Sequence, residues 1–253
     1  MAKTIAVVNQ KGGVGKTTTC VSLTAALKEK GLRVLLCDFD SQANATSGMG
    51  VDKTVSQGVY DDVLINGVEP AKRVVSTRYG DVLPSCKALA GAGIEMIGMD
   101  KREFLLRNAL QALAPNYDYI LIDCPPSLEL LTLNGLCAAD SVLVPVQGEY
   151  FALEGLSDLM NTIRVIKRSL NPKLELEGVL MTMFDSRTNL AMQVAEEVKR
   201  YFPGKVYATV IPRNVRLSEA PSHGKPITAY DRSSRGCEAY HNLADEFLRK
   251  NQA

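Results

Sequence analysis

Short apolar runs rich in β-branched residues alternate along this chain with longer segments in which apolar residues recur every three or four positions. The short runs predict strands at residues 4–9, 33–38, 80–84, 117–123, 141–146, 176–182 and 206–211. The longer segments predict helices at residues 16–30, 102–114, 128–138, 153–169, 190–201 and 234–249. Residues 5–8 and 119–122 are almost wholly apolar, which is typical of central parallel strands that are covered by helices on both faces.

This alternation predicts a single α/β domain over residues 1–253, with a doubly wound, mainly parallel sheet and helices on both faces. There is no internal repeat, low-complexity tract or linker. The connection at residues 41–73 is rich in Gly, Asn, Asp and Ser and longer than a turn requires, so we expect it to carry function or to move.

A glycine-rich loop at residues 11–18 separates the first predicted strand from the first predicted helix. Gly15-Lys16-Thr17 fits the end of the phosphate-loop signature G-x-x-x-x-G-K-[ST], although Gln10 stands where its first glycine belongs. Glycines let the backbone curl so that successive N–H groups face phosphate oxygens, and the helix N-terminus adds a positive dipole end. The predicted nucleotide contacts in this loop are Lys11, Gly12, Gly13, Val14, Gly15, Lys16, Thr17 and Thr18.

Four of these side chains have separate predicted roles. Lys16 should contact the β- and γ-phosphates, the Thr17 hydroxyl should bind Mg²⁺, and Thr18 should donate to the α-phosphate. Lys11 is a second lysine at the start of the loop. It can neutralise charge that develops during phosphoryl transfer, in its own site or in a partner's site.

Carboxylates end two of the predicted strands. Asp123 ends the run at residues 119–123 as a Walker B acid does, and we expect it to hold Mg²⁺ through water. The second predicted strand ends at Asp38, and Asp40 lies two residues further on, a spacing that puts both on one face of an extended segment. Asp38 is predicted to orient Mg²⁺-bound water and Asp40 to position the attacking water. The sequence therefore predicts an ATPase that uses ATP/ADP and Mg²⁺.

Composition adds limits and one asymmetry. The 253 residues are 46% hydrophobic and 23% charged, no run approaches the roughly 18 apolar residues of a membrane span, and no secretory leader is visible, so we expect a cytoplasmic protein. Six cysteines without C-x-x-C spacing predict buried free thiols.

Residues 187–235 carry nine basic and four acidic residues, although the whole chain has a net charge of +1. This segment indicates either a surface for a polyanion or a solvated face.

The segments at residues 11–18, 38–44, 122–126 and 211–214 together resemble the deviant Walker A ATPases. Within that group the chain resembles the ParA/Soj chromosome-partitioning family over nearly its whole length. Residues 150–156 and 215–225 narrow the resemblance to the Soj-like branch.

The resemblance implies a homodimer with ATP enclosed between two protomers. Lys11 would reach the partner's nucleotide, Asp40 would act in hydrolysis, and Glu149 would lie where the dimer interface approaches the nucleotide. Pro212 and Asn214 fall where the family recognises adenine.

The resemblance also implies DNA as a partner. Arg187, Arg216 and Lys225 fall where Soj-like proteins contact double-stranded DNA without sequence preference, within the basic segment. A ParB-type centromere-binding protein would stimulate hydrolysis, which would separate the protomers and release DNA. The protein would then be associated with the nucleoid and turn over ATP slowly.

Departures from the family pattern are few. Ser41 stands where many relatives carry proline and Ala43 where many carry glycine, and neither is expected to carry chemistry. The chain begins directly at the first predicted strand, so we expect no N-terminal DNA-binding leader domain.

Two rival functions use the same fold. A MinD-like membrane-cycling ATPase needs a basic amphipathic C-terminal helix, but Asp245 and Glu246 offset Arg249 and Lys250 in the tail, so we expect packing of that helix and no stable membrane association. A small-molecule ATP-dependent enzyme or a metal-cluster reductase is the other rival. The scattered cysteines give no sign of a cluster, and the sequence does not identify a substrate pocket.

Overall fold

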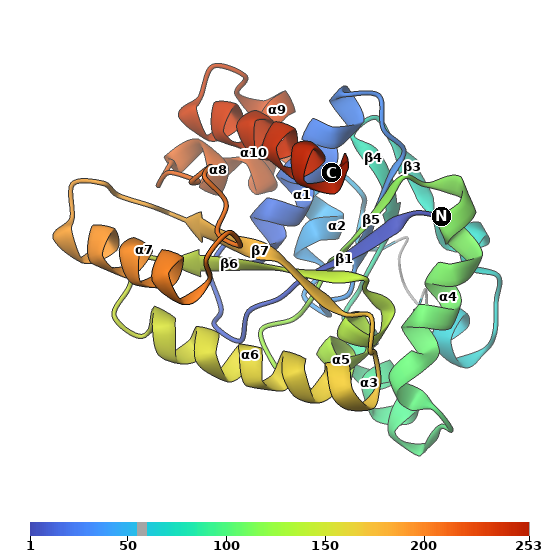
Figure 1. The fold of residues 1–253 in the computed structure, drawn as a ribbon. Coiled ribbons are helices and arrows are strands. Elements are labelled where there is room, and N and C mark those ends of the chain that lie inside the picture. The colour runs from blue at the N-terminus through green and yellow to red at the C-terminus, as the bar shows by residue number, and fades with distance from the viewer. Residues whose placement is uncertain (55–59, 253) are drawn as a thin grey trace.

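The computed structural model describes residues 1–54 and 60–252, which form one seven-stranded sheet with helices on both faces (Figure 1). The strands are β1 (Lys3–Val7), β2 (Val34–Asp38), β3 (Val75–Thr77), β4 (Gly80–Leu83), β5 (Tyr119–Asp123), β6 (Ser141–Gln147) and β7 (Glu175–Thr182). Their order is β3-β4-β2-β5-β1-β6-β7, and every neighbouring pair is parallel except β3 and β4. The predicted fold class is confirmed.

The α-helices are α1 (Lys16–Glu29), α2 (Asn44–Gly48), α3 (Leu89–Glu95), α4 (Leu105–Leu113), α5 (Leu130–Ala138), α6 (Ala152–Ser169), α7 (Asn189–Tyr201), α8 (Val215–Glu219), α9 (Ile227–Tyr230) and α10 (Arg235–Gln252). Short 3-10 or π-helical turns are η1 (Asp61–Ile65), η2 (Pro70–Arg73), η3 (Met96–Gly98), η4 (Arg102–Phe104), η5 (Ala114–Asn116) and η6 (Ala220–His223). The six predicted helices correspond to α1, to η4 with α4, and to α5, α6, α7 and α10.

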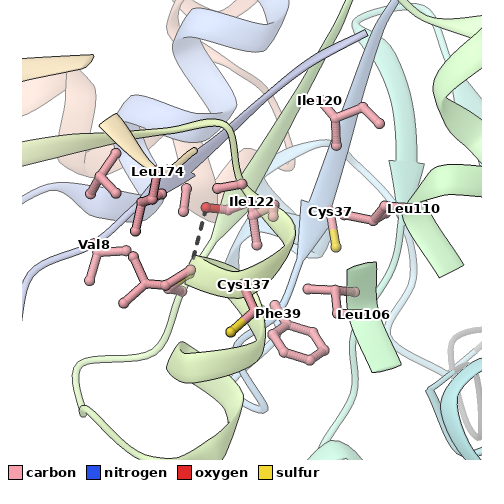
Figure 2. Close-up of a cluster of buried hydrophobic side chains, with 14 of the residues drawn as sticks. Val8, Cys37, Phe39, Leu106, Leu110, Ile120, Ile122, Cys137 and Leu174 are labelled. Carbon is pink, nitrogen blue, oxygen red and sulfur yellow. Dashed lines mark hydrogen bonds between the residues drawn. The ribbon is translucent and has the colours of Figure 1, made fainter. Parts of the chain in front are cut away.

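Alternate residues of the central strands enter two separate cores. In β5, Ile120 and Ile122 face the core beneath α4, α5, α6 and α7, whereas Leu121 faces the core beneath α1 and α10. Figure 2 shows part of the first core, where Cys37, Phe39 and Leu106 gather with other apolar side chains. Both faces of these strands are buried, and this explains why their sequences are nearly continuous apolar runs.

The predicted strand at residues 206–211 is wrong. This segment follows the edge of β7 and makes isolated bridges, with Val206 opposite Val179 and Pro212 opposite Phe184. Between the bridges, the backbone N–H groups of Ala208 and Thr209 donate to the Glu246 carboxylate of α10 at 2.7 and 2.8 Å. These two donors are therefore lost to a sheet ladder, and the edge strand is interrupted.

Sequence patterns also missed several short elements, namely β3, α2, α3, α8 and α9. The connection at residues 41–73 contains α2, η1 and η2, and its residues 55–59 lie outside the described part. Elements of three to seven residues span too few positions for a period to be recognised, and tertiary contacts hold them.

The C-terminal helix α10 packs against α1, as expected. Tyr240, Leu243 and Phe247 are buried, and the Tyr240 hydroxyl lies 3.2 Å from the Thr19 hydroxyl of α1. In the described part of the chain no helix is both long enough and apolar enough to cross a membrane. All six cysteines are buried free thiols, which confirms that prediction.

Candidate nucleotide-binding site

The loop between β1 and α1 has a backbone that suits anion binding. Gly13 (φ 73°) and Gly15 (φ 88°) adopt the left-handed conformation, which glycine enters without a steric penalty. Gly15 directly precedes α1, a helix of 14 residues that starts at Lys16. Helix N-terminal N–H groups and the helix dipole therefore face the space above this loop.

Lys16 lies across the loop. Its side chain is only 7% exposed, and Nζ donates to the carbonyl oxygens of Asn9 (2.9 Å) and Lys11 (3.0 Å). Burial lowers the pKa of the Lys16 ammonium, while the nearby Asp123 carboxylate acts in the opposite direction. A phosphate that enters the loop would satisfy this poorly solvated cation.

Three residues that sequence reasoning missed hold the loop in place. The Asn9 amide donates to Pro145 O (2.7 Å) and its Oδ1 accepts from Lys11 N (2.9 Å). The Thr182 hydroxyl donates to Val14 O at 2.7 Å, and Gln147 Nε2 donates to Gly13 O at 2.9 Å. These contacts fix the shape of the loop through the carbonyl groups of Gly13 and Val14 and the N–H group of Lys11. Asn9 adjoins the motif, but Gln147 and Thr182 give no local signal.

Asp38 and Asp123 end two paired strands and lie at the same register position of β2 and β5. Asp123 is 1% exposed, and its Oδ2 has no hydrogen-bond partner among the described residues. Burial, and then the Asp38 charge, raise the pKa of Asp123 well above its ordinary range. A buried carboxylate oxygen without a donor is a suitable ligand for a hard cation.

Asp38 is already engaged within the protein. Its Oδ2 accepts from the backbone N–H (2.6 Å) and the hydroxyl (2.7 Å) of Thr46, and its Oδ1 accepts from Asp40 N at 3.3 Å. Burial raises the pKa of Asp38, and the Thr46 donors oppose that shift. Asp38 thus anchors α2, in addition to any contact with a metal-bound water.

Asp40 is half-buried at the start of the turn that leads into α2. Its Oδ1 accepts from Gln42 N at 3.0 Å, and its carbonyl oxygen accepts from Ala43 N at 2.9 Å. The Asp40 charge influences the pKa of both Lys16 and Asp123.

Lys11 faces outward, unlike Lys16. Its side chain is 50% exposed and forms an ion pair with Glu149, which follows β6. The structure thus brings together these two residues, which are 138 positions apart in sequence. Tyr150 and Phe151, directly after Glu149, are large exposed aromatic residues beside this pair.

A cleft of about 440 Å³ adjoins the start of α1. Its walls include Thr17 and Thr18 of α1, Asn44 of α2, and Lys225. Pro212 and Asn214 are not among the described lining residues. Pro212 lies beside the end of β7, while Asn214 caps α8 by accepting from Arg216 N at 2.8 Å.

The predicted DNA contacts Arg187 and Arg216 are exposed but paired. Arg187, whose side chain is 88% exposed, donates two hydrogen bonds to Asp185 at 2.9 and 2.7 Å. That contact lowers the pKa of Asp185 to about 2. Arg216 pairs with Glu219 (2.8 Å) and with Asp231 (3.3 Å).

A parallel strand, a left-handed glycine loop, a helix N-terminus and a strand-end carboxylate define a P-loop nucleotide-binding protein. Residues 2–176 match the family model described as "AAA domain". The Bacillus subtilis sporulation initiation inhibitor protein Soj is 59% identical over 249 residues, which cover 97% of this chain and 98% of Soj. The Myxococcus xanthus chromosome partitioning protein ParA is 52% identical over 252 residues, or 99% of this chain and 89% of ParA.

A solved structure is also similar. A Mycobacterium smegmatis protein, described as cobyrinic acid a,c-diamide synthase with bound ADP and magnesium, has a TM-score of 0.87 and 39% identity. The match covers 100% of this chain and 96% of that one. The present chain belongs to the Soj/ParA family of chromosome-partitioning ATPases. The predicted family and ATPase class are confirmed.

Proposed function

We propose that this ATPase is a nucleotide-gated dimer that holds DNA while ATP is bound and releases it after hydrolysis. The observation that carries the proposal is the contrast between the two loop lysines. Lys16 is buried and turned into its own loop, whereas Lys11 is half-exposed and turned outward. A cation on the outer side of the loop can reach a phosphate held by a second protomer.

In this proposal each protomer binds ATP through the N–H groups of residues 11–18. Lys16 contacts the β- and γ-phosphates, and Thr18 contacts the α-phosphate. Thr17 would hold Mg²⁺, with Asp123 and Asp38 acting through water, and the bound ion would neutralise phosphate charge. Asp123 Oδ2, which has no hydrogen-bond partner among the described residues, supports this assignment.

Asp40 is the proposed residue that positions the attacking water, because it lies two residues after the end of β2 and its backbone N–H donates to the Asp38 carboxylate at 3.3 Å. Pro212 and Asn214 remain the proposed adenine contacts. Glu149, now paired with Lys11, would exchange this contact for the dimer interface near the nucleotide. The rate of hydrolysis then determines how long the dimer lasts.

Double-stranded DNA is the proposed polyanion for Arg187, Arg216 and Lys225. Such phosphate contacts are weak, independent of sequence and dependent on salt, and a dimer doubles their number. A ParB-type protein is the proposed activator of hydrolysis, and the nucleoid the proposed location. The name of the Myxococcus relative, chromosome partitioning protein ParA, supports a chromosome as cargo.

Gel filtration of the wild-type protein and of Lys11→Ala tests the two-site role of Lys11. With ATP and Mg²⁺ the wild type should elute as a dimer, while Lys11→Ala should bind ATP yet remain monomeric. Normal ATP-dependent dimerisation of Lys11→Ala would exclude the proposed cross-protomer contact.

The two rivals have direct tests. A membrane-cycling protein would sediment with liposomes in the presence of ATP, whereas we expect none to sediment, because the apolar face of α10 is buried. A small-molecule enzyme would need its substrate for ATP turnover. Turnover stimulated by DNA, without any added small molecule, supports partitioning instead.

A further inference from the structure

A second cleft, of about 610 Å³, lies between the β3–β4 hairpin, the turn that follows α2, and the connection from η6 to α9. Arg78 and Tyr79 line it from the hairpin, Asp52 from the turn, and His223 and Lys225 from the connection. These residues come from three distant parts of the sequence. Arg78 lies outside the basic segment at residues 187–235.

The walls of this cleft are held together by two glycines. Gly50 (φ 78°) and Gly224 (φ 60°) are both left-handed, and a Cβ on Gly50 would lie only 2.9 Å from Gly224 O. The backbone segment that carries Lys225 therefore packs directly on the turn after α2. This contact fixes the position of Lys225 relative to the turn that follows α2.

Arg78 and Lys225 differ from Arg187 and Arg216, the other two predicted DNA contacts, in their ion pairing. Both are exposed, and neither forms an ion pair within residues 1–54 and 60–252. The Arg78 guanidinium lies 4.8 Å from the centre of the Tyr79 ring. A phosphate that binds Arg187 or Arg216 must displace a carboxylate, whereas at Arg78 and Lys225 no such displacement is needed.

The remaining charges of the cleft do not cancel this pair. Asp52 is the single carboxylate among the described lining residues, and it already accepts from Thr54 N at 2.8 Å. His223 stacks on Tyr230 with ring centres 4.9 Å apart. The cleft therefore offers two cations against one carboxylate, a balance that favours an anion.

Lys225 also connects this cleft to the nucleotide site and to the predicted DNA surface. It lines the 440 Å³ cleft beside Thr17 and Thr18 as well. In the chain, η6 follows directly on α8, which carries Arg216. A strand of DNA that contacts Arg216 can continue over η6 toward the hairpin.

We propose that Arg78, together with Lys225, forms an additional contact site for a phosphate of the DNA backbone, on the β3–β4 hairpin. The site extends the basic surface beyond residues 187–235. It rests on the proposed DNA binding of the ATP-bound dimer, and it takes a phosphodiester of any sequence because the cleft presents charge to the backbone only.

The test is fluorescence anisotropy of a labelled DNA duplex with ATP-bound protein at several salt concentrations. Wild type, Arg78→Gln and Arg78→Lys are compared with Arg168→Gln, which removes an exposed arginine of α6 on the opposite face of the sheet. Gel filtration with ATP and thermal unfolding establish that all four proteins fold and dimerise.

Loss of one phosphate contact per protomer should reduce the slope of log affinity against log salt by about 0.9, hence by about 1.8 per dimer. Arg78→Gln should show this reduction, while Arg78→Lys and Arg168→Gln should keep the wild-type slope. A wild-type slope for Arg78→Gln overturns the new site alone. A wild-type protein that binds no DNA with ATP overturns the proposed function, and the new site with it.

Discussion

At the scale of single residues, the buried acids of the site carry the largest electrostatic consequences. Asp123 and Asp38 lie opposite each other in the sheet, and both have raised pKa values because burial disfavours their charged forms. With neither cation nor nucleotide bound, these charges destabilise the folded chain. The two buried acids therefore lower the stability of the unliganded protein, and their value lies in their proposed role in the site.

Asp123→Asn tests this directly. A carboxyl whose pKa is raised on folding leaves the fold most stable below the ordinary pKa, and the fold loses stability progressively as the pH rises from the ordinary pKa to the raised pKa. Without Mg²⁺ and nucleotide, the variant should thus unfold at a higher temperature than wild type at pH 8, and the difference should shrink toward pH 5. Thermal unfolding across this range measures it. A constant difference at all pH values would contradict the electrostatic cause.

The Lys16 ammonium is the central cation of the phosphate loop. Lys16→Ala removes the group that bridges the loop carbonyls of Asn9 and Lys11 and that should contact the β- and γ-phosphates. We expect ATP affinity to fall at least tenfold, since a charge-assisted phosphate contact is worth about 1.5–3 kcal/mol. Calorimetric titration with ATP measures the affinity, and gel filtration should show no ATP-dependent dimer. A variant that still dimerises with ATP would refute the assignment.

At the scale of elements, the turn into α2 stores backbone strain. Ala43 has φ 53° and ψ 40°, a left-handed conformation that an L-residue with a Cβ enters at a cost of about 1–2 kcal/mol. Ala43 is one of the two departures from the family pattern, where glycine is common. Alanine at this position should change the stability of the fold and not the chemistry of the site, because its side chain is a methyl group without polar atoms.

Ala43→Gly should therefore stabilise the protein by about 0.5–1 kcal/mol, measured by denaturant unfolding. The matched control is Ala45→Gly, two residues further on and inside α2. There the same substitution should destabilise, because Ala45 is helical and fully buried. Equal effects of the two substitutions would show that the left-handed backbone at position 43 is not the cause.

Much of the fold was predictable because the central elements are long enough for their periods to be read. Six of the seven predicted strands match β1, β2, β4, β5, β6 and β7. The segment at residues 206–211 failed because Glu246, some 37 residues away, takes its N–H groups. A side chain that lies so far away in the sequence cannot be recognised from the pattern of residues 206–211.

The residues of the candidate site also fall into two groups, those that a sequence pattern marks and those that only the fold brings to the site. Lys16, Thr17 and Asp123 could be found because a contiguous motif or a strand end marks them. Gln147, Thr182 and Arg78 could not be found, because their roles come from the sheet order and the packing of the hairpin, which bring distant residues to one place.

At the scale of the whole molecule, Arg187 and Arg216 are not among the described residues that line the cleft beside Thr17 and Thr18, so changing them should separate DNA binding from nucleotide binding. Arg187→Glu and Arg216→Glu reverse exposed charges and leave residues 11–18 intact. Each should lower DNA affinity at least tenfold while ATP-dependent dimerisation stays normal, as judged by anisotropy and gel filtration.

Arg200→Glu is the matched control for these reversals. Arg200 lies on α7 in the same basic segment and pairs with Glu197, as Arg187 pairs with Asp185. It should reduce DNA affinity much less. Equal losses for all three reversals would mean that net charge, and not a defined surface, determines binding.

The gating of DNA binding by ATP is the central claim, and the Asp40→Ala protein tests it most directly. Asp40 is placed to act in hydrolysis and does not contact the Lys16 ammonium by any hydrogen bond within the described residues. Gel filtration and duplex anisotropy are measured together, with ATP and with ADP. We predict a stable DNA-bound dimer with ATP, and a monomer that does not bind DNA with ADP. A protein that stays monomeric with ATP bound, or that hydrolyses ATP at the wild-type rate, would contradict the account.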